Sequence, residues 1–307
     1  MKPRPGLSAT TPLRRGSVVG GYEVLVQLCS GGMGQLYEVA DLALGRRALL
    51  KVLHERHRGR RDYAARLREE ARLLAHLTGG RVPAVFGTGE IRDGQPYFVM
   101  ERLFGRDLRF ELGRFGVMSV PTAVRIVLDL LDTLAFVHGR AVVHRDVKLD
   151  NLILDDQGRL HLIDFGVARR RDAPLALTRP GVAMGTLRMM APEQHAGEEA
   201  DERTDVYAAG LVLFELVTGR GPFDHLSGNA AAMRAAHCGS TPPLPSWCAP
   251  QSVPSAVEAV VTRALAKRAE DRFASARAMA TALRDTAGYE NIEGPTFVDP
   301  SMKGGAA

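Results

Sequence analysis

The octet HRDVKLDN at residues 144–151 concentrates side chains that can do acid–base and metal chemistry. Two basic groups, two carboxylates, an amide and an imidazole fall within eight positions, between the apolar segments AVV and LIL. The apolar segments predict buried strands, which puts the octet on a loop between them. A solvated turn needs only one or two polar residues and a Gly or Pro. This loop contains neither, so its composition favours a functional site.

A second carboxylate, Asp164 in HLIDFGVA, ends an apolar run just before Gly166. The segment LILDDQGRLHLI between Asn151 and Asp164 predicts two strands around a DDQG turn. Such a hairpin would return Asp164 to the side of Asn151. A carboxylate and an amide oxygen that converge suit a hard cation, and beside a phosphate ligand that cation is Mg²⁺.

Lys51 lies inside the apolar strand segment ALLKVL, where a charged group needs a partner. A helix expected at residues 62–77 offers one. On one face of that helix, positions 63, 67, 70, 74 and 77 read Tyr, Leu, Glu, Leu and Leu, whereas Glu69 points outward. We therefore expect an ion pair between Lys51 and Glu70, with extension of both side chains to solvent as the alternative.

A glycine-dense turn in LCSGGMGQLYEV, residues 28–39, separates two strand patterns. Glycine lets the backbone approach a polyanion with its N–H groups turned toward phosphate oxygens. Any glycine hairpin would look similar, so this signal is weak alone. No GK[ST] follows, which excludes a P-loop and leaves a flap over phosphates as the functional interpretation.

The elements that position these residues divide the chain into two parts. Strand-like segments dominate from residue 18 to about 100, with a DG turn at 93–94 that predicts a hairpin. Helical patterns follow: a helix at 121–138 between Pro and Gly139, an apolar helix at 206–217 in the centre of its lobe, and one or two helices over 255–286. Residues 1–17 and 288–307 lack periodicity and are expected to be flexible tails.

Composition excludes several classes of protein. The chain has 307 residues with 45% hydrophobic content and no run of eighteen apolar residues, so we expect no membrane span. The net charge of +5 is spread along the chain without aromatic interleaving, which argues against nucleic-acid binding. The N-terminal segment lacks the apolar core of a secretory signal, and Cys29, Cys238 and Cys248 are spaced for neither disulfides nor zinc. These features predict a reduced, cytoplasmic setting.

Together the motifs resemble, in content and order, the eukaryotic-like Ser/Thr protein kinases of bacteria. The match covers about residues 18 to 285. Its motifs are SGGMG, ALLK, REEA, HRDVKLDN, DFG at 164–166, MGT at 184–186, APE at 191–193, DVYAAG at 205–210 and DRF at 271–273. The resemblance implies an α+β, two-lobed protein kinase fold: a small antiparallel β-rich N-lobe with one helix (18–101) and a larger, mainly helical C-lobe (104–287).

The resemblance also implies an ATP- and Mg²⁺-dependent kinase, with Mn²⁺ as an alternative metal, acting on Ser/Thr of protein substrates. The implied catalytic residues are Lys51, Glu70, Asp146 and Lys148; the metal ligands are Asn151 and Asp164. The implied ATP-binding residues are Leu28, Cys29, Ser30, Gly31, Gly32, Met33, Gly34, Leu36, Ala48, Lys51, Met100, Glu101, Leu103, Ile153 and Ile163. Ala48 and Ile163 would line the adenine pocket, with Met100 at its back and residues 101–103 as the hinge. The implied regulatory residues are Arg145, Thr178 and Thr186, with Thr178 as the phosphosite. We expect His144 to be a packing residue and not a base.

The family pattern is broken at several positions. Cys29 replaces the first flap glycine, either because it is small enough to be tolerated or because it is a redox-sensitive thiol. Leu187 and Met189 replace a Pro and a Tyr before APE, which bears on the choice of substrate peptide. Two alternatives are a pseudokinase scaffold, which would be expected to lack Lys51, Asp146 or Asp164, and a small-molecule phosphotransferase, which would lack the long segment from DFG to APE.

Overall fold

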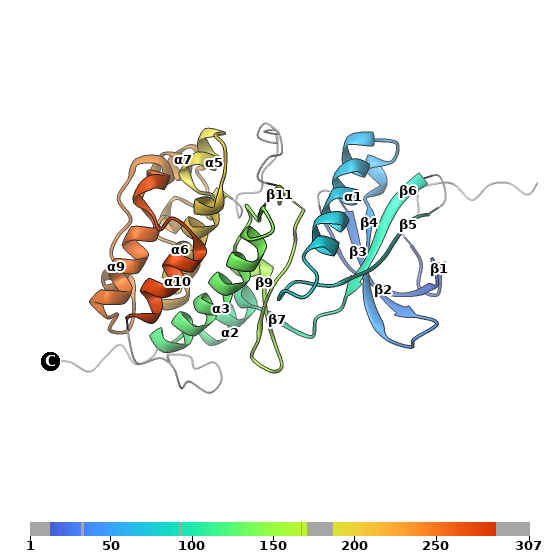
Figure 1. Cartoon of the computed structure of the whole chain (residues 1–307), viewed down its shortest axis with the longest axis horizontal. Coiled ribbons are helices and arrows are strands. Elements are labelled where there is room, and N and C mark those ends of the chain that lie inside the picture. The colour runs from blue at the N-terminus through green and yellow to red at the C-terminus, as the bar shows by residue number, and fades with distance from the viewer. Residues whose placement is uncertain (1–12, 32–33, 92–93, 167, 171–186, 287–307) are drawn as a thin grey trace, which may run out of the picture. The chain divides into compact units, whose positions relative to one another are not determined.

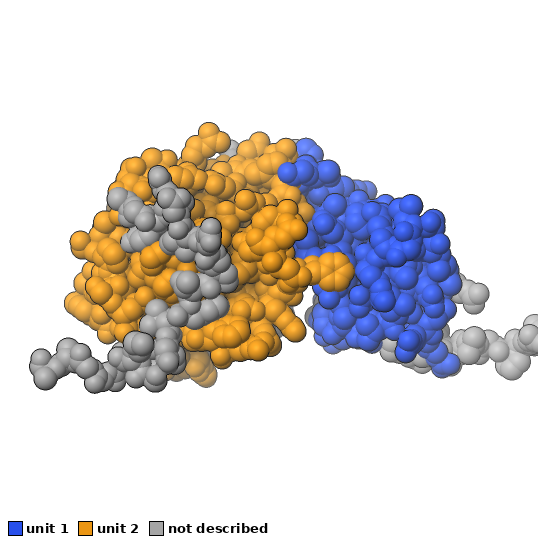
Figure 2. All heavy atoms as spheres, turned by 90° about the horizontal axis from the view of Figure 1, so that it is seen from below, with its two compact units in different colours: residues 1–79, 83–103 blue, residues 80–82, 104–307 orange. Residues whose placement is uncertain are grey.

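The computed structural model describes residues 13–31, 34–91, 94–166, 168–170 and 187–286 (Figure 1). The chain forms two compact units, residues 1–79 with 83–103 and residues 80–82 with 104–307 (Figure 2). Residues 80–82, which we expected in the first lobe, belong to the second unit. There the Arg81 carbonyl accepts a hydrogen bond from the Leu162 N–H at 3.0 Å, and the Arg81 guanidinium pairs with Asp129 at 2.6 Å.

An antiparallel six-stranded sheet builds the first unit, as the apolar segments predicted. Its strands are β1 (Val18–Val19), β2 (Tyr22–Ser30), β3 (Gly34–Asp41), β4 (Arg47–Leu53), β5 (Val85–Ile91) and β6 (Gln95–Glu101). They lie in the order β1-β2-β3-β4-β6-β5. The pairing of β5 with β6 confirms the expected hairpin, although residues 92–93 of its turn lie outside the described residues.

The two faces of this sheet have different roles because side chains alternate along each strand. One face carries a buried cluster that includes Val39, Ala48, Leu50 and Val99. The helix α1 (Arg61–His76), predicted from its apolar stripe, packs against β4, β5 and β6. A short 3₁₀ turn, η1 (Glu55–His57), precedes it.

Helices dominate the second unit. They are α2 (Leu108–Phe115), α3 (Val120–His138), α5 (Pro192–Ala196), α6 (Glu202–Thr218), α7 (Ala230–Gly239), α8 (Pro245–Cys248), α9 (Ser255–Ala264) and α10 (Ala276–Arg284). The predicted helix at 121–138 is α3, whose N-cap Ser119 accepts from the Thr122 N–H and which ends before Gly139. The 255–286 segment contains α9 and α10, with the 3₁₀ turn η5 (Ala269–Asp271) between them.

The helix α6 lies at the centre of this unit. Every residue from 204 to 218 is buried, and the helix packs against α3, α9 and α10. This confirms the expectation from its all-round apolar sequence, since a helix with no polar face must be covered on all sides. Two acidic side chains on it, Asp205 and Glu215, are nonetheless buried.

Short strands complete the second unit. Strands β7 (Gly105–Asp107), β9 (Leu152–Asp155) and β10 (Leu160–Leu162) form one sheet, and β8 (Val142–Val143) pairs with β11 (Arg169–Arg170). The predicted hairpin around the DDQG turn is confirmed, because β9 and β10 pair with Leu152 opposite Leu162. Residues 144–148, here called the HRD loop, follow β8, and a 3₁₀ turn, η3 (Leu149–Asn151), leads from this loop into β9.

Candidate active site

Within the first unit, Lys51 and Glu70 form the ion pair that the sequence predicted. Lys51 Nζ lies 2.5 Å from Glu70 Oε1, with side-chain exposures of 17% and 2%. Glu70 lies on the same stripe of α1 as the buried Leu67 and Leu74, so the lysine neutralises a carboxylate that faces the protein interior. Glu69, expected to point outward, is partly exposed and lies 3.6 Å from Arg72.

The glycine-rich segment joins the ends of β2 and β3. Residues Leu28 to Gly31 are exposed, and Cys29 is paired with Leu36 in the β2–β3 ladder. At Gly34 a Cβ atom would lie 2.7 Å from the Val52 carbonyl oxygen, so only glycine fits beside this backbone. Gly32 and Met33, two of the expected flap residues, lie outside the described residues.

The structure separates one expected adenine-pocket residue, Ala48, from Lys51. Ala48 is fully buried in the cluster with Leu50 on the face of β4 opposite Lys51. Leu49 alternates onto the face of Lys51, and its β6 partner is Met100. A shift of one residue along a strand transfers a side chain to the other face of the sheet, so Leu49, and not Ala48, shares a face with Lys51.

The other residues that were expected to contact ATP lie on several strands and loops. Leu36 pairs with Lys51, so the two side chains share a face of the first sheet. Glu101 ends β6, and its backbone and side chain both bond to Ala84, while Leu103 is buried. In the second unit, Ile153 and Ile163 are partly buried on and beside the β9–β10 hairpin.

In the second unit the HRD loop brings three predicted site residues together. Lys148 Nζ lies 2.7 Å from Asp146 Oδ2. Asn151 Nδ2 donates to the Asp146 carbonyl at 2.8 Å and to its carboxylate Oδ2 at 3.1 Å. Burial raises the pKa of Asp146, against the opposing effect of the Lys148 ammonium, and the charge of Asp164 raises it further.

The conformation of this loop depends on Asp205 of α6. The Asp205 carboxylate accepts the backbone N–H of His144 and of Arg145, each at 2.8 Å, and lies 2.8 Å from His138 Nε2. Arg145 has φ +68°, a left-handed conformation that costs free energy in a non-glycine residue, so these bonds hold a strained backbone in place. The sequence marked Asp205 only as part of DVYAAG and did not reveal this role.

His144 is a packing residue in the structure. It is fully buried, its Nε2 lies 3.1 Å from the Ile163 carbonyl oxygen, and its Nδ1 accepts from the Asp146 N–H at 3.3 Å. Its ring meets the edge of Phe165 with centroids 4.7 Å apart. The imidazole thus links the HRD loop to the DFG segment.

Asp164 and Asn151 are joined through the hairpin between them. The Ile163 N–H donates to the Asn151 carbonyl at 2.9 Å, which places the two predicted metal ligands on adjacent strand ends. Asp164 is exposed, has φ +62°, and accepts from the Gly166 N–H at 3.2 Å. Among the described residues no group of three His, Cys, Asp or Glu side chains could hold a metal by itself.

The predicted regulatory residues are only partly described. Arg145 Nη2 donates to the Ala200 carbonyl at 3.2 Å, and burial lowers the pKa of its guanidinium. Thr178 and Thr186 lie outside the described residues, so the structure does not locate them. Of the two unusual residues before APE, Leu187 is half-buried and Met189 is buried.

Two ion-pair networks with buried members stabilise the segment around the APE motif at residues 191–193. Glu193 pairs with the fully buried Arg272 of the DRF motif at 2.8 Å and accepts from the Thr204 hydroxyl at 2.7 Å. Glu215, only 1% exposed, binds the guanidinium groups of both Arg109 and Arg188. No sequence signal linked these residues, which come from distant parts of the chain.

The chain belongs to the protein kinase family. Residues 22–283 match the family described as "Protein kinase domain". A probable serine/threonine-protein kinase of Corynebacterium efficiens is 39% identical over 269 residues, which cover 85% of this chain and 40% of the relative. The serine/threonine-protein kinase PknD of Mycobacterium tuberculosis is 35% identical over 270 residues, covering 88% of this chain and 40% of the relative.

Solved structures support the same assignment. The kinase domain of Mycobacterium tuberculosis PknI superposes with a TM-score of 0.69 at 29% identity, covering 90% of this chain and all of that domain. The chain therefore has the two-lobed kinase fold that the sequence predicted, and it spans about 40% of the length of the curated relatives named above. Within the described part of the chain, no helix is both long and apolar enough to cross a bilayer.

Proposed function

We propose that the chain is an active protein kinase that transfers the γ-phosphate of ATP to Ser/Thr hydroxyls of protein substrates. The observation that carries this proposal is the convergence of Lys148 and Asn151 on the carboxylate of Asp146. The relatives named as serine/threonine-protein kinases support Ser/Thr acceptors. The cytoplasmic setting expected from the cysteine spacing is part of the same proposal.

Asp146 is the proposed acceptor of the proton from the attacking hydroxyl. Because burial raises its pKa, the carboxylate is a stronger base than an exposed aspartate, and the ammonium group of Lys148, 2.7 Å away, opposes that rise by favouring the ionised form. The same ammonium is the proposed partner of the charge on the transferred phosphoryl group. One loop therefore supplies both the proposed base, Asp146, and the proposed electrostatic stabiliser, Lys148.

The donor set fits a magnesium ion. Both hydrogen bonds of the Asn151 amide to Asp146 use Nδ2, which leaves its Oδ1 oriented to accept a cation. Asp164 offers an exposed carboxylate at the end of the adjoining strand. One carboxylate and one amide oxygen are a suitable protein contribution, because Mg²⁺ takes its other ligands from phosphates and water. When bound, the ion would neutralise charge on the phosphates of ATP.

Lys51 is the proposed ligand of the α- and β-phosphates, held in position by Glu70. A free lysine would sample many rotamers, whereas the 2.5 Å contact to a buried carboxylate fixes its ammonium group. On the same face of the sheet, Leu36, Leu49 and Met100 are the proposed apolar contacts of the adenine base, with Leu49 in place of Ala48.

Regulation by phosphorylation of Thr178 remains a proposal based on Arg145. Burial lowers the pKa of this guanidinium, so a nearby anion would stabilise its charged form. A phosphate on Thr178 would supply that anion, while Thr186 would help to position the substrate. A phosphosite map of active enzyme that lacks Thr178 would contradict this assignment.

The proposed activity can be tested by autophosphorylation with labelled ATP and Mg²⁺. We expect label in the wild-type protein and a loss of at least about 10²-fold in the Lys51→Ala and Asp164→Asn variants. Asp132→Asn is a matched control, because Asp132 is an exposed aspartate on α3 that pairs with Arg284. A labelled Asp164→Asn protein, or an unlabelled wild type, would contradict the proposal.

A further inference from the structure

The helix α2 of the second unit combines basic and aromatic side chains on its exposed face. Phe110 and Arg114 lie four residues apart on this helix, so their side chains share one face. Arg106 of β7 joins them, because its guanidinium carbon lies 4.8 Å from the centre of the Phe110 ring. All three residues are exposed, and Phe110 is 41% exposed. Aromatic side chains and arginine are enriched at protein interfaces, so this α2 face, formed by Arg106, Phe110 and Arg114, suits a docking surface.

The two arginines of the α2 face have no acidic partner in the part of the chain that the structure describes. By contrast, Arg109 on the same helix pairs with two carboxylates. Arg106 and Arg114 lie instead over the rings of Phe110 and Phe115, each at 4.8 Å. A guanidinium over a ring can still donate from the N–H groups at its edge, so both arginines can bind carboxylates of a docked segment.

The segment that follows α10 has the complementary composition. Residues 287–302 contain three carboxylates, those of Glu290, Glu293 and Asp299, and no Lys, Arg or His. Four large apolar side chains lie among them: Tyr289, Ile292, Phe297 and Val298. An acidic and aromatic segment therefore follows a domain that carries a basic and aromatic face.

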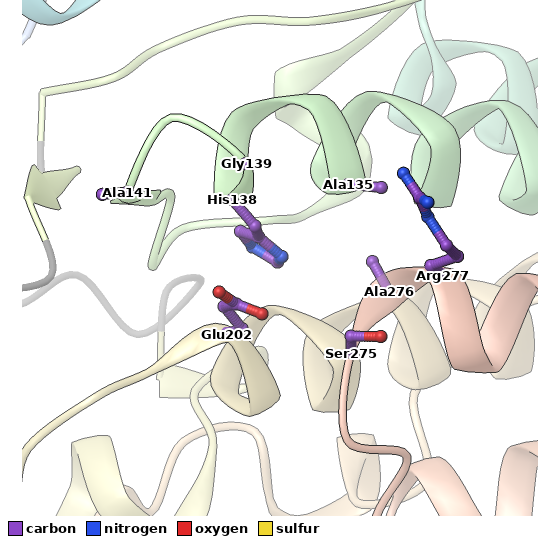
Figure 3. Close-up of a pocket in the computed structure, with 8 residues that line it drawn as sticks. All are labelled: Ala135, His138, Gly139, Ala141, Glu202, Ser275, Ala276 and Arg277. Atoms are coloured by element: carbon purple, nitrogen blue, oxygen red, sulfur yellow. The ribbon is translucent and has the colours of Figure 1, made fainter.

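The direction of α10 brings this segment toward α2. His138, at the end of α3, and Ser275, at the start of α10, line one cavity (Figure 3). At the other end of α10, Arg284 pairs with Asp132, which lies nearer the start of α3. The helix α10 therefore runs back along α3, toward the end that follows α2.

The segment is also long enough to reach the α2 face. The helix α3 begins at Val120, shortly after α2 ends at Phe115. The part of α3 from Asp132 back to Val120 is about 18 Å long, whereas an extended chain from Thr286 to Phe297 spans about 36 Å. A tether of this length gives the segment a high local concentration at α2, which favours docking within one chain over docking between two chains.

We propose that residues 289–299 of this chain dock on the α2 face. The carboxylates of Glu290 and Glu293 pair with Arg106 and Arg114, and apolar side chains of the segment cover the ring of Phe110. The helix leaves room for this contact, because a Cβ atom added at Gly113 would meet nothing within 4 Å. The contact involves none of the residues of the proposed phosphotransfer site.

Photo-crosslinking of the full chain tests the proposal directly. Phe110 would be replaced by p-benzoylphenylalanine, the protein irradiated without ATP, and the crosslinked peptides identified by mass spectrometry. We expect crosslinks to residues 289–299 in a product with the mass of one chain. Trp247 of α8, 76% exposed, would be replaced in the same way as a control and should not crosslink to this segment. No crosslink from position 110 to the segment, a crosslink found only between two chains, or an equal yield from position 247 would overturn the proposal.

A glutamyl endopeptidase, which cleaves after Glu290 and Glu293, provides a second measurement with the native Phe110 in place. Docking should protect both peptide bonds in the wild type. Arg106→Glu combined with Arg114→Glu should speed this cleavage about 5-fold or more, because two attractions become repulsions. Equal cleavage rates in the wild type and this double variant would also overturn the proposal.

Two further variants separate docking from a general effect of charge. Arg234→Glu combined with Arg263→Glu makes the same charge change at exposed residues of α7 and α9, and it should leave the cleavage rate unchanged. In the crosslinking protein, the double variant of α2 should lower the yield, and adding Glu290→Arg and Glu293→Arg should restore it. Failure of this charge exchange to restore the yield would contradict the assigned ion pairs. All of these measurements are made without ATP, so their outcome is independent of the proposed kinase activity.

Discussion

Acid should destabilise the second unit through His237 of α7. This imidazole is fully buried, its Nδ1 lies 2.9 Å from the Tyr207 hydroxyl, and its ring stacks on His195 with centroids 5.3 Å apart. Burial, followed by the charges of His195 and Lys267, lowers its pKa to about 3. The folded protein therefore resists protonation of this group at any pH above that value.

The sign and size of the effect follow from linkage. Below pH 6.5, the ordinary pKa of histidine, the unfolded chain takes up a proton at His237 that the folded chain does not. The stability contribution is therefore fully present above pH 6.5 and is lost as the pH falls. With a folded pKa of about 3, lowering the pH from 8 to 5 should remove about 2 kcal/mol of unfolding free energy through this group alone.

Urea unfolding of wild type and His237→Gln at a series of pH values from about 8 to 5 tests this prediction. The variant should lose about 2 kcal/mol less than the wild type over that range, because its buried amide does not titrate. His225→Gln, at an exposed histidine, is the matched control and should retain the wild-type pH dependence. Identical pH dependence in wild type and His237→Gln would refute the reasoning.

Three other predictions concern buried charges. Burial lowers the pKa of Lys267 to about 8, so the unfolded state binds more protons than the folded state between pH 8 and 10.5, and wild-type stability should rise with pH over that range. At pH 7 the Lys267→Met variant should be about 1–3 kcal/mol more stable than the wild type, and a less stable variant in urea unfolding would count against this. Glu215→Gln should lower the free energy of unfolding by about 3 kcal/mol in the same assay, because the guanidinium groups of Arg109 and Arg188 lose their buried carboxylate. A variant as stable as the wild type would contradict the role of this network. Because the folded protein raises the pKa of Asp146, ionisation of this group destabilises the folded state at pH values above the ordinary pKa of an aspartate. Asp146→Asn removes this penalty, so calorimetry should find an unfolding temperature equal to that of the wild type or higher.

The elements with strong periodicity could be predicted from the sequence. Alternating apolar segments predicted strands β2 to β6, and helical spacing predicted α1, α3 and α6, because burial of one face leaves a regular pattern. The helices α2 and α7 are shorter and less regular, with few buried positions, so they left no comparable signal.

The candidate site was predictable where its residues are close together in the sequence or joined by one hairpin. The octet at 144–151 and Asp164 satisfy this condition, and the Lys51–Glu70 pair was found because a charge on each apolar face required a partner. The face of Ala48 could not be predicted, because a strand segment alone does not reveal which of two adjacent apolar residues lies on the side of Lys51. The supporting role of Asp205 arises from tertiary packing, which no local pattern encodes.

The central claim, that Asp146 activates a Ser/Thr hydroxyl of a protein substrate, is tested most directly by phosphate transfer to an added protein. Wild type and Asp146→Asn would be incubated with labelled ATP, Mg²⁺ and a basic acceptor protein, and the label identified by phosphoamino acid analysis. We predict phosphoserine and phosphothreonine from the wild type, no phosphotyrosine, and a loss of at least about 10²-fold in Asp146→Asn. Undiminished transfer by Asp146→Asn, or label only on tyrosine, would contradict the claim.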